Sequence, residues 1–203
     1  IGNMNAITYK EVFPLIKENK LWIGATNFNV GMYFKVPDDF EYAETYKFDR
    51  KRNGEKVSRV PGVCWFTNID HGRRHEPLPL MTMDDNLKYS KHKEIKGKKS
   101  YNKYDNYDGI EVPFVDSIPS DFKGVMGVPI SFLNKYSPEQ FEIVGLGIAN
   151  LGLEAGVKPY KPEHRKYRKD VQKRGVVDGD LYMMIDGVVT VPYARVLIRH
   201  KKM

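Results

Sequence analysis

The stretch that decides the predicted fold is Val63-Cys64-Trp65-Phe66-Thr67-Asn68-Ile69-Asp70-His71-Gly72-Arg73-Arg74, in which an apolar run leads directly into a basic tip. Apolar, aromatic and β-branched residues favour a buried strand. The Asn, Asp and Gly that follow favour a turn. Two adjacent arginines at a strand end suit contact with a phosphate or a base edge, because each guanidinium is a planar, permanently charged fork of donors. The same pattern also fits a core strand that ends in a solvated loop.

The composition favours a single domain, or slightly more, with a polyanionic partner. The chain has 203 residues, of which 41% are apolar, and a net charge of +7. No apolar run approaches the roughly 20 residues that span a bilayer, and no signal-peptide pattern is present, so we expect no membrane association. The single cysteine, Cys64, excludes an internal disulfide, which favours a cytoplasmic location.

The first 26 residues predict a strand end, a helix and a second strand, which is half of an α/β layer. Thr8 and Glu11 have the spacing of a capping box, so a helix is expected to begin there and to end near Asn19. Pro14 conflicts with this helix, because it lacks an N–H and should kink the helix or delay its start. Residues 21–26 then have the apolar pattern of a buried strand.

The rest of the chain predicts a β-rich arrangement. Asn53-Gly54 and Asp186-Gly187 both favour tight hairpins. Ser137 followed by proline predicts a helix start, with Gln140 reaching back to the capping residue. Residues 141–144 then continue this helix or turn into a short strand. Further strands are expected at residues 33–36, 62–68, 110–115 and 195–199, and residues 125–133 predict a strand or a bent connector. The fold class is therefore α/β, mixed and β-rich, with short helices, long basic loops and a closing C-terminal hairpin.

Two segments concentrate positive charge. Residues 88–103 interleave seven lysines with aromatic side chains, and residues 158–175 carry eight lysines and arginines. Each segment can be a solvated loop, or it can contact phosphates while its tyrosines stack on bases. With the basic tip, the candidate DNA-binding residues are Asn68, His71, Arg73, Arg74, Lys98, Lys99, Tyr101, Arg165, Lys166 and Arg168.

The residues alone supply no complete active site. Asp105-Asn106-Tyr107-Asp108 can be a hydrogen-bonded turn or part of a substrate pocket. Asp70, His71 and His75 could serve a metal-dependent nuclease, but they lie in a Gly/Arg/Pro loop without the acidic helix of a zinc hydrolase, so no metal site is expected.

Several separated blocks, in order along the chain, resemble the EcoRI-type adenine-specific DNA methyltransferases. The resemblance runs from Gly2 to the end and is weakest in 27–60 and 84–100. The blocks are Gly2-Asn3-Met4-Asn5-Ala6-Ile7, Trp65-Phe66-Thr67-Asn68-Ile69-Asp70-His71, Tyr104-Asp105-Asn106-Tyr107-Asp108, Gly127-Val128-Pro129-Ile130-Ser131-Phe132-Leu133, Gln140-Phe141-Glu142-Ile143-Val144-Gly145 and Tyr193-Ala194-Arg195-Val196-Leu197-Ile198-Arg199.

The resemblance implies transfer of a methyl group from S-adenosylmethionine to N6 of an adenine that is flipped out of double-stranded DNA. It also implies a catalytic Asp/Asn/Ser-Pro-Pro-aromatic tetrapeptide and a glycine-rich, acidic cofactor loop. This chain has neither and begins at Ile1 without a methionine, so it resembles the C-terminal portion of the family, and we expect no catalytic residue in it.

Under this interpretation, residues 1–70 complete a methyltransferase-like sheet whose catalytic strands are missing here. Residues 71–203 are then a DNA-recognition region with the closing hairpin. Asn3 and Asn5 follow a strand at its loop end, where α/β sheets place ligands, and are candidate substrate-pocket residues; they can equally form a turn that leads into the helix. A non-catalytic nucleic-acid-binding module is the alternative function.

Overall fold

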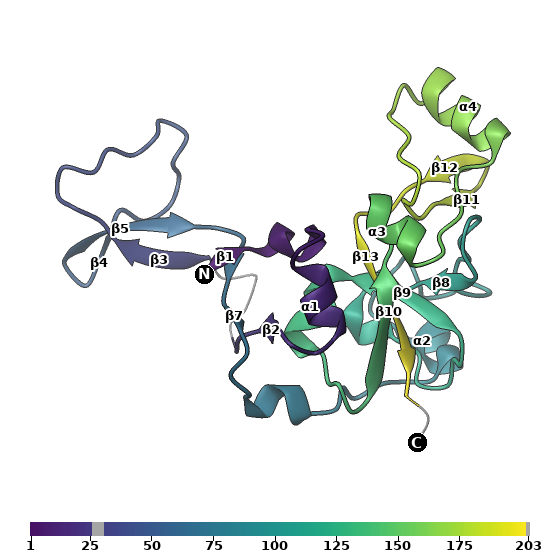
Figure 1. The fold of residues 1–203 in the computed structure, drawn as a ribbon, viewed down its shortest axis with the longest axis horizontal. Helices are drawn as coiled ribbons and strands as arrows, with labels where there is room; N and C mark the ends of the chain where they lie inside the picture. Colours follow the sequence, from purple (N-terminus) through teal and green to yellow (C-terminus); the bar gives the residue numbers. More distant parts are fainter. Residues whose placement is uncertain (26–30, 202–203) are drawn as a thin grey trace.

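The computed structural model describes residues 1–25 and 31–201, and it confirms a mixed, β-rich α/β fold. Figure 1 shows a body built on one four-stranded sheet, with an arm that projects from it. The predicted strand at 21–26 is observed as β2 (Trp22–Ile23), and its position 26 lies outside the described residues. None of the described helices has the length and apolar character needed to cross a bilayer.

The sheet of the body has the order β10 (Phe141–Leu146), β13 (Arg195–His200), β9 (Val125–Pro129) and β8 (Gly109–Glu111). The β8–β9 pair is parallel, whereas β13 is antiparallel to both of its neighbours. Val196, Leu197 and Ile198 of β13 are fully buried. This continuous apolar run is what a strand covered on both faces requires, so the last strand of the sequence lies inside the sheet.

The helices of the described residues are all short, and some of them cover this sheet. The α-helices are α1 (Phe13–Lys17), α2 (Met83–Tyr89), α3 (Ala149–Glu154) and α4 (Pro162–Asp170), and the 3-10 helices are η1 (Met4–Thr8), η2 (Gly72–His75), η3 (Val115–Ser117) and η4 (Ile130–Lys135). α1 and α3 both contact β10. The fully buried side chains of Ile7, Ile118 and Phe132 extend the core beneath η1, η3 and η4.

The strand predicted at 62–68 is two short strands. β6 (Val63–Cys64) pairs with β1 (Gly2–Asn3), and β7 (Phe66–Thr67) pairs with β2. Trp65 separates them and is 48% exposed. Cys64 is buried, and this burial raises the pKa of its thiol to about 11. The strands of residues 1–70 thus form small antiparallel ladders apart from the four-stranded sheet.

The first helix begins later than the Thr8–Glu11 spacing predicts. η1 precedes it, and the α-helix starts only at Phe13 with Pro14 in its first turn, where a missing N–H costs nothing. The Thr8 hydroxyl donates instead to the carbonyl of Asn5, at 2.8 Å. Asn19 follows the helix with a φ of 56°, so the predicted helix end is confirmed.

The helix start predicted at Ser137 is wrong, whereas the short strand left open for residues 141–144 is observed within β10. The N–H groups of Gln140 and Phe141 bond to the Ser137 carbonyl, which makes a single turn, and the chain then enters β10. The Gln140 side chain donates to and accepts from the backbone of Leu78 instead of capping a helix. Phe141 and Ile143 alternate into the core, so pairing with β13 outweighs the local helix signal.

Both predicted hairpins are confirmed. β11 (Met183–Ile185) pairs with β12 (Val188–Thr190) across Asp186-Gly187, and β4 (Lys51–Arg52) pairs with β5 (Glu55–Val60) across Asn53-Gly54. All four turn residues have positive φ, as such tight turns require. β3 (Met32–Lys35) completes the second hairpin to a three-stranded sheet, which forms the arm.

Candidate nucleic-acid interface

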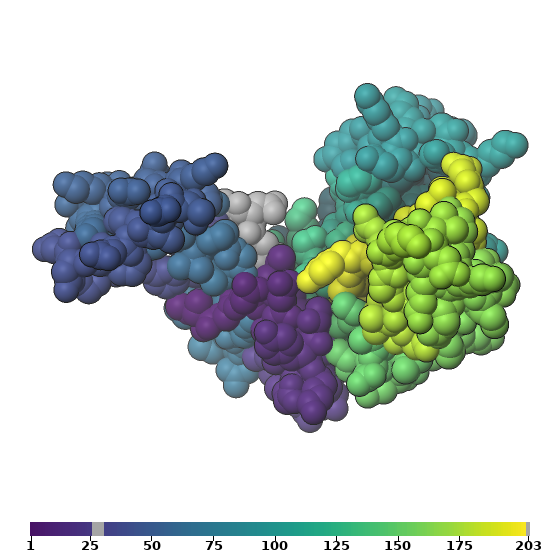
Figure 2. Space-filling view, turned by 90° about the horizontal axis from the view of Figure 1, so that it is seen from above, coloured from purple at the N-terminus to yellow at the C-terminus, as the bar shows by residue number. Residues whose placement is uncertain are grey.

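The β11–β12 hairpin is the point at which the two basic segments meet. The segment after α4 is tied to it, because Gln172 Nε2 donates to the Val189 carbonyl at 2.9 Å. On its other side, Met183 and Ile185 line a cavity of about 310 Å³ together with Lys98. In Figure 2 the yellow C-terminal residues run between the teal segment of residues 88–103 and the green segment of α4.

α4 presents its charge outward because it buries none of its residues. Arg165 is used internally: one of its terminal nitrogens lies 2.6 and 2.7 Å from the two carboxylate oxygens of Asp178. This hydrogen bond holds the pKa of Asp178 below its ordinary value. Arg168 Nε donates to the Gly175 carbonyl at 2.8 Å. The two arginines therefore shape the segment, and the exposed lysine predicted here, Lys166, is left free to contact a partner.

The hairpin and α4 are held to the sheet by the block around Asn106. The buried Asn106 amide donates to the carbonyls of Lys158 and Asp180, both at 2.9 Å, and accepts from the Tyr182 N–H at 3.1 Å. The Asp105 carboxylate accepts from the Met184 N–H at 2.7 Å. Of the two interpretations left open for this block, the structure shows the hydrogen-bonded turn, and its effect is to position the basic segment.

In the lysine-rich segment, lysines and tyrosine behave differently. Lys98 and Lys99 are exposed, as a phosphate contact requires. Tyr101 is only 7% exposed and its hydroxyl donates to the Ser117 carbonyl at 2.7 Å, so the expectation that it stacks on a base is wrong for this structure. Burial raises the pKa of its hydroxyl, and the side chain belongs to the core.

The two arginines of the basic tip, Arg73 and Arg74, have different surroundings. Arg74 is only 6% exposed, its guanidinium donates to Asp70 at 2.9 Å and to Asn19, and it lies 3.6 Å above the Trp22 ring. The prediction that both arginines lie on the surface is therefore wrong for Arg74, which joins its own turn to the segment of residues 19–22. Arg73 is exposed and forms no ion pair with any described residue.

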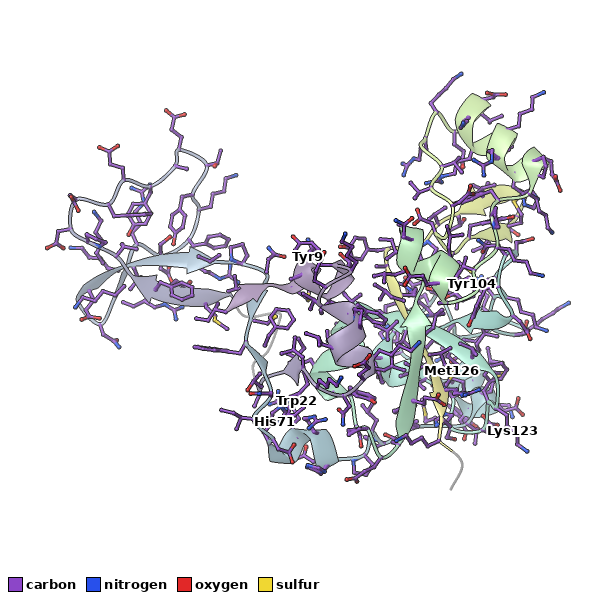
Figure 3. All side chains as sticks on the ribbon, in the orientation of Figure 1. Tyr9, Trp22, His71, Tyr104, Lys123 and Met126 are labelled. Atoms are coloured by element: carbon purple, nitrogen blue, oxygen red, sulfur yellow. The ribbon has the colours of Figure 1, made fainter. Side chains whose placement is uncertain are left out.

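The other polar residues of the tip are held in the same turn. Asn68 is exposed, whereas His71 Nε2 lies 2.9 Å from the Ile23 carbonyl, and Figure 3 shows His71 beside Trp22. His75 lies 2.8 Å from both Glu139 and Asp70. The hydrogen bond to Glu139, with that to Asp70, raises the pKa of His75. The hydrogen bond from His75 is the largest cause of the lowered pKa of Asp70.

Asn3 and Asn5 lie together at the opening of the chain. The Asn3 side chain accepts from the Asn5 N–H at 2.8 Å and caps η1, which is the turn-forming role weighed for it. Asn5 Oδ1 accepts from the Tyr193 hydroxyl at 2.8 Å. All three side chains are exposed, so this hydrogen bond joins the first and the last of the sequence blocks at the surface.

The predicted residues therefore form separate groups. The β11–β12 hairpin brings Lys98 and α4 to one part of the body, whereas Figure 1 shows η2, with Arg73, at the lower left and α4 at the upper right. Within 1–25 and 31–201, no three His, Cys, Asp or Glu side chains are grouped so that they could hold a metal ion.

The site list from the sequence missed two kinds of residue. The first is Lys169, which is exposed one turn from Lys166 on the same side of α4. The basic run of the sequence already contained Lys169, but without the start of the helix its position beside Lys166 could not be predicted. Tyr193 contacts Asn5 across 188 positions of sequence, for which no local signal exists.

Comparison with known proteins finds matches along nearly the whole chain. The family model described as "Adenine-specific methyltransferase EcoRI" matches residues 1–201. The chain is 37% identical over 204 residues to the type II methyltransferase M.EcoRI of Escherichia coli, which covers 100% of this chain and 50% of that protein. It is 37% identical over 145 residues to M.MpnI of Mycoplasma pneumoniae and 39% identical over 146 residues to M.MgeORF184P of Mycoplasma genitalium, in each case over 71% of this chain and 42% of the relative. The chain thus spans half, or less, of the length of these curated relatives. No solved structure matches.

Proposed function

The chain belongs to the family of EcoRI-type adenine-specific methyltransferases, and from this premise we propose that it is the DNA-recognising portion of a DNA adenine-N6 methyltransferase of a restriction–modification system. The observation that carries this proposal is α4, a helix that buries none of its residues and presents Lys166 and Lys169 to solvent. Its anchoring by Arg165 and Asn106 fixes where these lysines point.

The partner best suited to this surface is the phosphate backbone of duplex DNA. Lysines that neutralise phosphates release condensed counterions, so affinity falls steeply as salt rises. Lys98 and Lys99 lie on the other side of the β11–β12 hairpin from α4, which gives the hairpin a basic segment on each side. Phosphate contacts of this kind fix the register of a protein on DNA without reading its sequence. Arg73, at the η2 tip, is the arginine we propose for a further contact.

We place the methyl-transfer chemistry outside these 203 residues. The sequence contains no Pro-Pro dipeptide and therefore no catalytic tetrapeptide of the kind the family implies. The residues here also do not fit S-adenosylmethionine. Gly145 and Gly147 have the glycine spacing that comes nearest to a nucleotide-binding loop, but the space beside them is filled from within: a Cβ on Gly145 would lie 2.5 Å from the Ala155 side chain, and one on Gly147 would lie 2.2 Å from the Leu181 side chain. We therefore propose that the complete enzyme binds this cofactor with other residues.

The chain contributes to the target pocket, in this proposal, through its opening block. Asn3, Asn5 and Tyr193 are exposed polar groups held to one another at the end of β1. A flipped adenine is recognised by hydrogen bonds to its polar edge. The side-chain amides of Asn3 and Asn5 supply such donors and acceptors.

The test is salt-dependent binding of a fluorescent duplex by the chain and by two matched double variants. Lys166→Gln/Lys169→Gln removes two charges from α4, and the control, Lys10→Gln/Lys123→Gln, removes two exposed charges elsewhere. We expect the α4 variant to lower the slope of log affinity against log salt by about 2 and the control to leave it within about 0.5, because each lost phosphate contact lowers the slope by roughly one. An equal effect of both variants would reject α4 as the interface.

Calorimetry with S-adenosylmethionine tests the second half of the proposal. We expect no tight binding by the chain itself, and a tight, stoichiometric complex would overturn the assignment of the cofactor to other residues. The absent tetrapeptide favours one alternative, a nucleic-acid-binding module without catalysis. A coding sequence upstream of Ile1 that contains a Pro-Pro-aromatic block supports the enzyme, and an immediate start codon supports the module.

A further inference from the structure

The arm formed by residues 31–60 projects from the body as a separate lobe. Figure 2 shows it standing clear of the sheet and its helices, and Figure 3 shows many of its side chains on its outer faces. Val57 is its one buried apolar residue among positions 31–60. Because the arm has so little core and stands away from the body, it adds little to the stability of the body. Its surface is therefore available for contact with a partner molecule.

The arm is nevertheless held in one shape by its aromatic residues. Phe40, Tyr42, Tyr46 and Phe48 follow one another with ring centroids 4.7 to 5.6 Å apart. The Tyr42 hydroxyl donates to the Val57 carbonyl at 2.7 Å, and the Arg59 N–H donates to the Tyr46 hydroxyl at 2.7 Å. These contacts fasten the loop between β3 and β4 onto β5, so the arm is ordered before any partner arrives.

Two tyrosine rings of the arm also hold arginines in place. The Arg52 guanidinium lies 3.5 Å above the Tyr33 ring, and the Arg50 guanidinium lies 4.9 Å above the Tyr42 ring. A guanidinium that is stacked on an aromatic face keeps its N–H edge directed outward in the plane, where it can bond to a phosphate. Lys51, between them, is exposed and forms no ion pair with any described residue.

The charge of the arm is divided along its length. Arg50, Lys51 and Arg52 lie at the β4–β5 turn, whereas Asp38, Asp39, Glu41 and Glu44 lie in the loop between β3 and β4. Two acidic residues also flank the turn: Asp49 lies 3.6 Å from Arg52, and Glu55 pairs with Lys35 at 2.7 Å, so among the described residues Arg50 and Lys51 carry its unpaired positive charge. A polyanion is attracted by the first group and repelled by the second. The arm can therefore approach DNA by its turn, and the acidic loop fixes which way it faces.

We propose that the β4–β5 turn is a second DNA contact, in which Arg50, Lys51 and Arg52 bind the phosphates of a stretch of duplex away from α4. This inference rests on the proposed function, since it needs the chain to bind DNA. The tight Asn53-Gly54 turn keeps the basic tip narrow, and the stacked arginines lose little conformational freedom on binding. With α4 on the body and the tip on the arm, the chain grips the duplex at two separate places.

The test is the binding of a long duplex, of about 40 base pairs, by the chain carrying substitutions of the tip. The triple variant is Arg50→Gln/Lys51→Gln/Arg52→Gln, and the minimal variant is Lys51→Gln, which removes no ring contact. The control, Asp38→Asn/Asp39→Asn/Glu41→Gln, removes three charges of the opposite sign from the acidic loop. We expect the triple variant to weaken binding about tenfold or more near 0.1 M salt and to lower the salt slope by 2 to 3, and Lys51→Gln to lower the slope by about 1. The control is expected to bind at least as tightly as the parent. Tyrosine near-UV circular dichroism checks that the arm stays folded.

The outcomes separate this inference from the function on which it rests. If the tip variants bind like the parent while Lys166→Gln/Lys169→Gln loses affinity, the tip is not a DNA contact and the proposed function stands. If the parent itself fails to bind duplex DNA, the proposed function fails and the tip assignment fails with it. If the tip variants change the sedimentation coefficient of the chain and leave its DNA affinity unaltered, the arm joins two copies of the chain and the inference is overturned.

Discussion

Replacing Asn106 by aspartate tests whether this residue fixes the hairpin and α4 to the sheet. The substitution keeps the size of the side chain and the oxygen that accepts from the Tyr182 N–H, but it removes both donors and places an acidic oxygen against the carbonyls of Lys158 and Asp180. Asn106 is only 3% exposed, so each of the two lost hydrogen bonds costs about 1–2 kcal/mol. With the added repulsion between oxygens, we expect a destabilisation of about 3–5 kcal/mol.

Urea denaturation followed by tryptophan fluorescence measures this loss, and Asn102→Asp is the matched control. Asn102 lies four residues earlier and is exposed, so the same chemical change there should cost less than about 0.5 kcal/mol. Amide exchange should show that residues 158–184 lose protection first in the Asn106 variant. A destabilisation below about 1 kcal/mol, or a uniform loss of protection, would refute the reasoning that this side chain anchors the segment.

Two further predictions concern charged groups. Glu111→Gln leaves the partly buried guanidinium of Arg195, bonded at 2.6 Å to the buried Glu111, without its counter-charge, and should cost about 3–5 kcal/mol in denaturant unfolding. The exposed pair lost in Glu142→Gln should cost less than about 1 kcal/mol, and equal losses would contradict the role of burial. The hydrogen bond to Glu139 is the main cause that raises the pKa of His75, so the contribution of His75 to stability is full below pH 6.5 and is lost as pH rises through the folded-state pKa. An NMR titration should find the pKa of His75 above 6.5 in the parent and closer to 6.5 in Glu139→Gln. Identical titrations of the two proteins would contradict the pairing.

The features that the sequence predicted well are those with local causes. Asn53-Gly54 and Asp186-Gly187 specify tight turns because their backbones must adopt positive φ, and the structure has both hairpins. The separated blocks predicted the family, because several matches in order constrain the whole chain, and the family is now shown.

The features that it predicted poorly depend on distant partners. Arg74 looked like a surface arginine, yet Trp22 and Asn19, more than 50 positions earlier, enclose it. The Ser137 turn carried a strong local helix signal, but β13, at the far end of the chain, recruits the following residues into the sheet. No local pattern reports such pairings, because they are decided by which surfaces the folded chain brings together.

The central claim, that the surface beside the β11–β12 hairpin binds DNA, is tested most directly by amide hydrogen exchange of the chain with and without a saturating duplex. We predict that added duplex slows exchange in α4 and in residues 93–100, and leaves the strands of the four-stranded sheet, which are already protected, unchanged. Slowed exchange that spares both of these basic segments would contradict the claim.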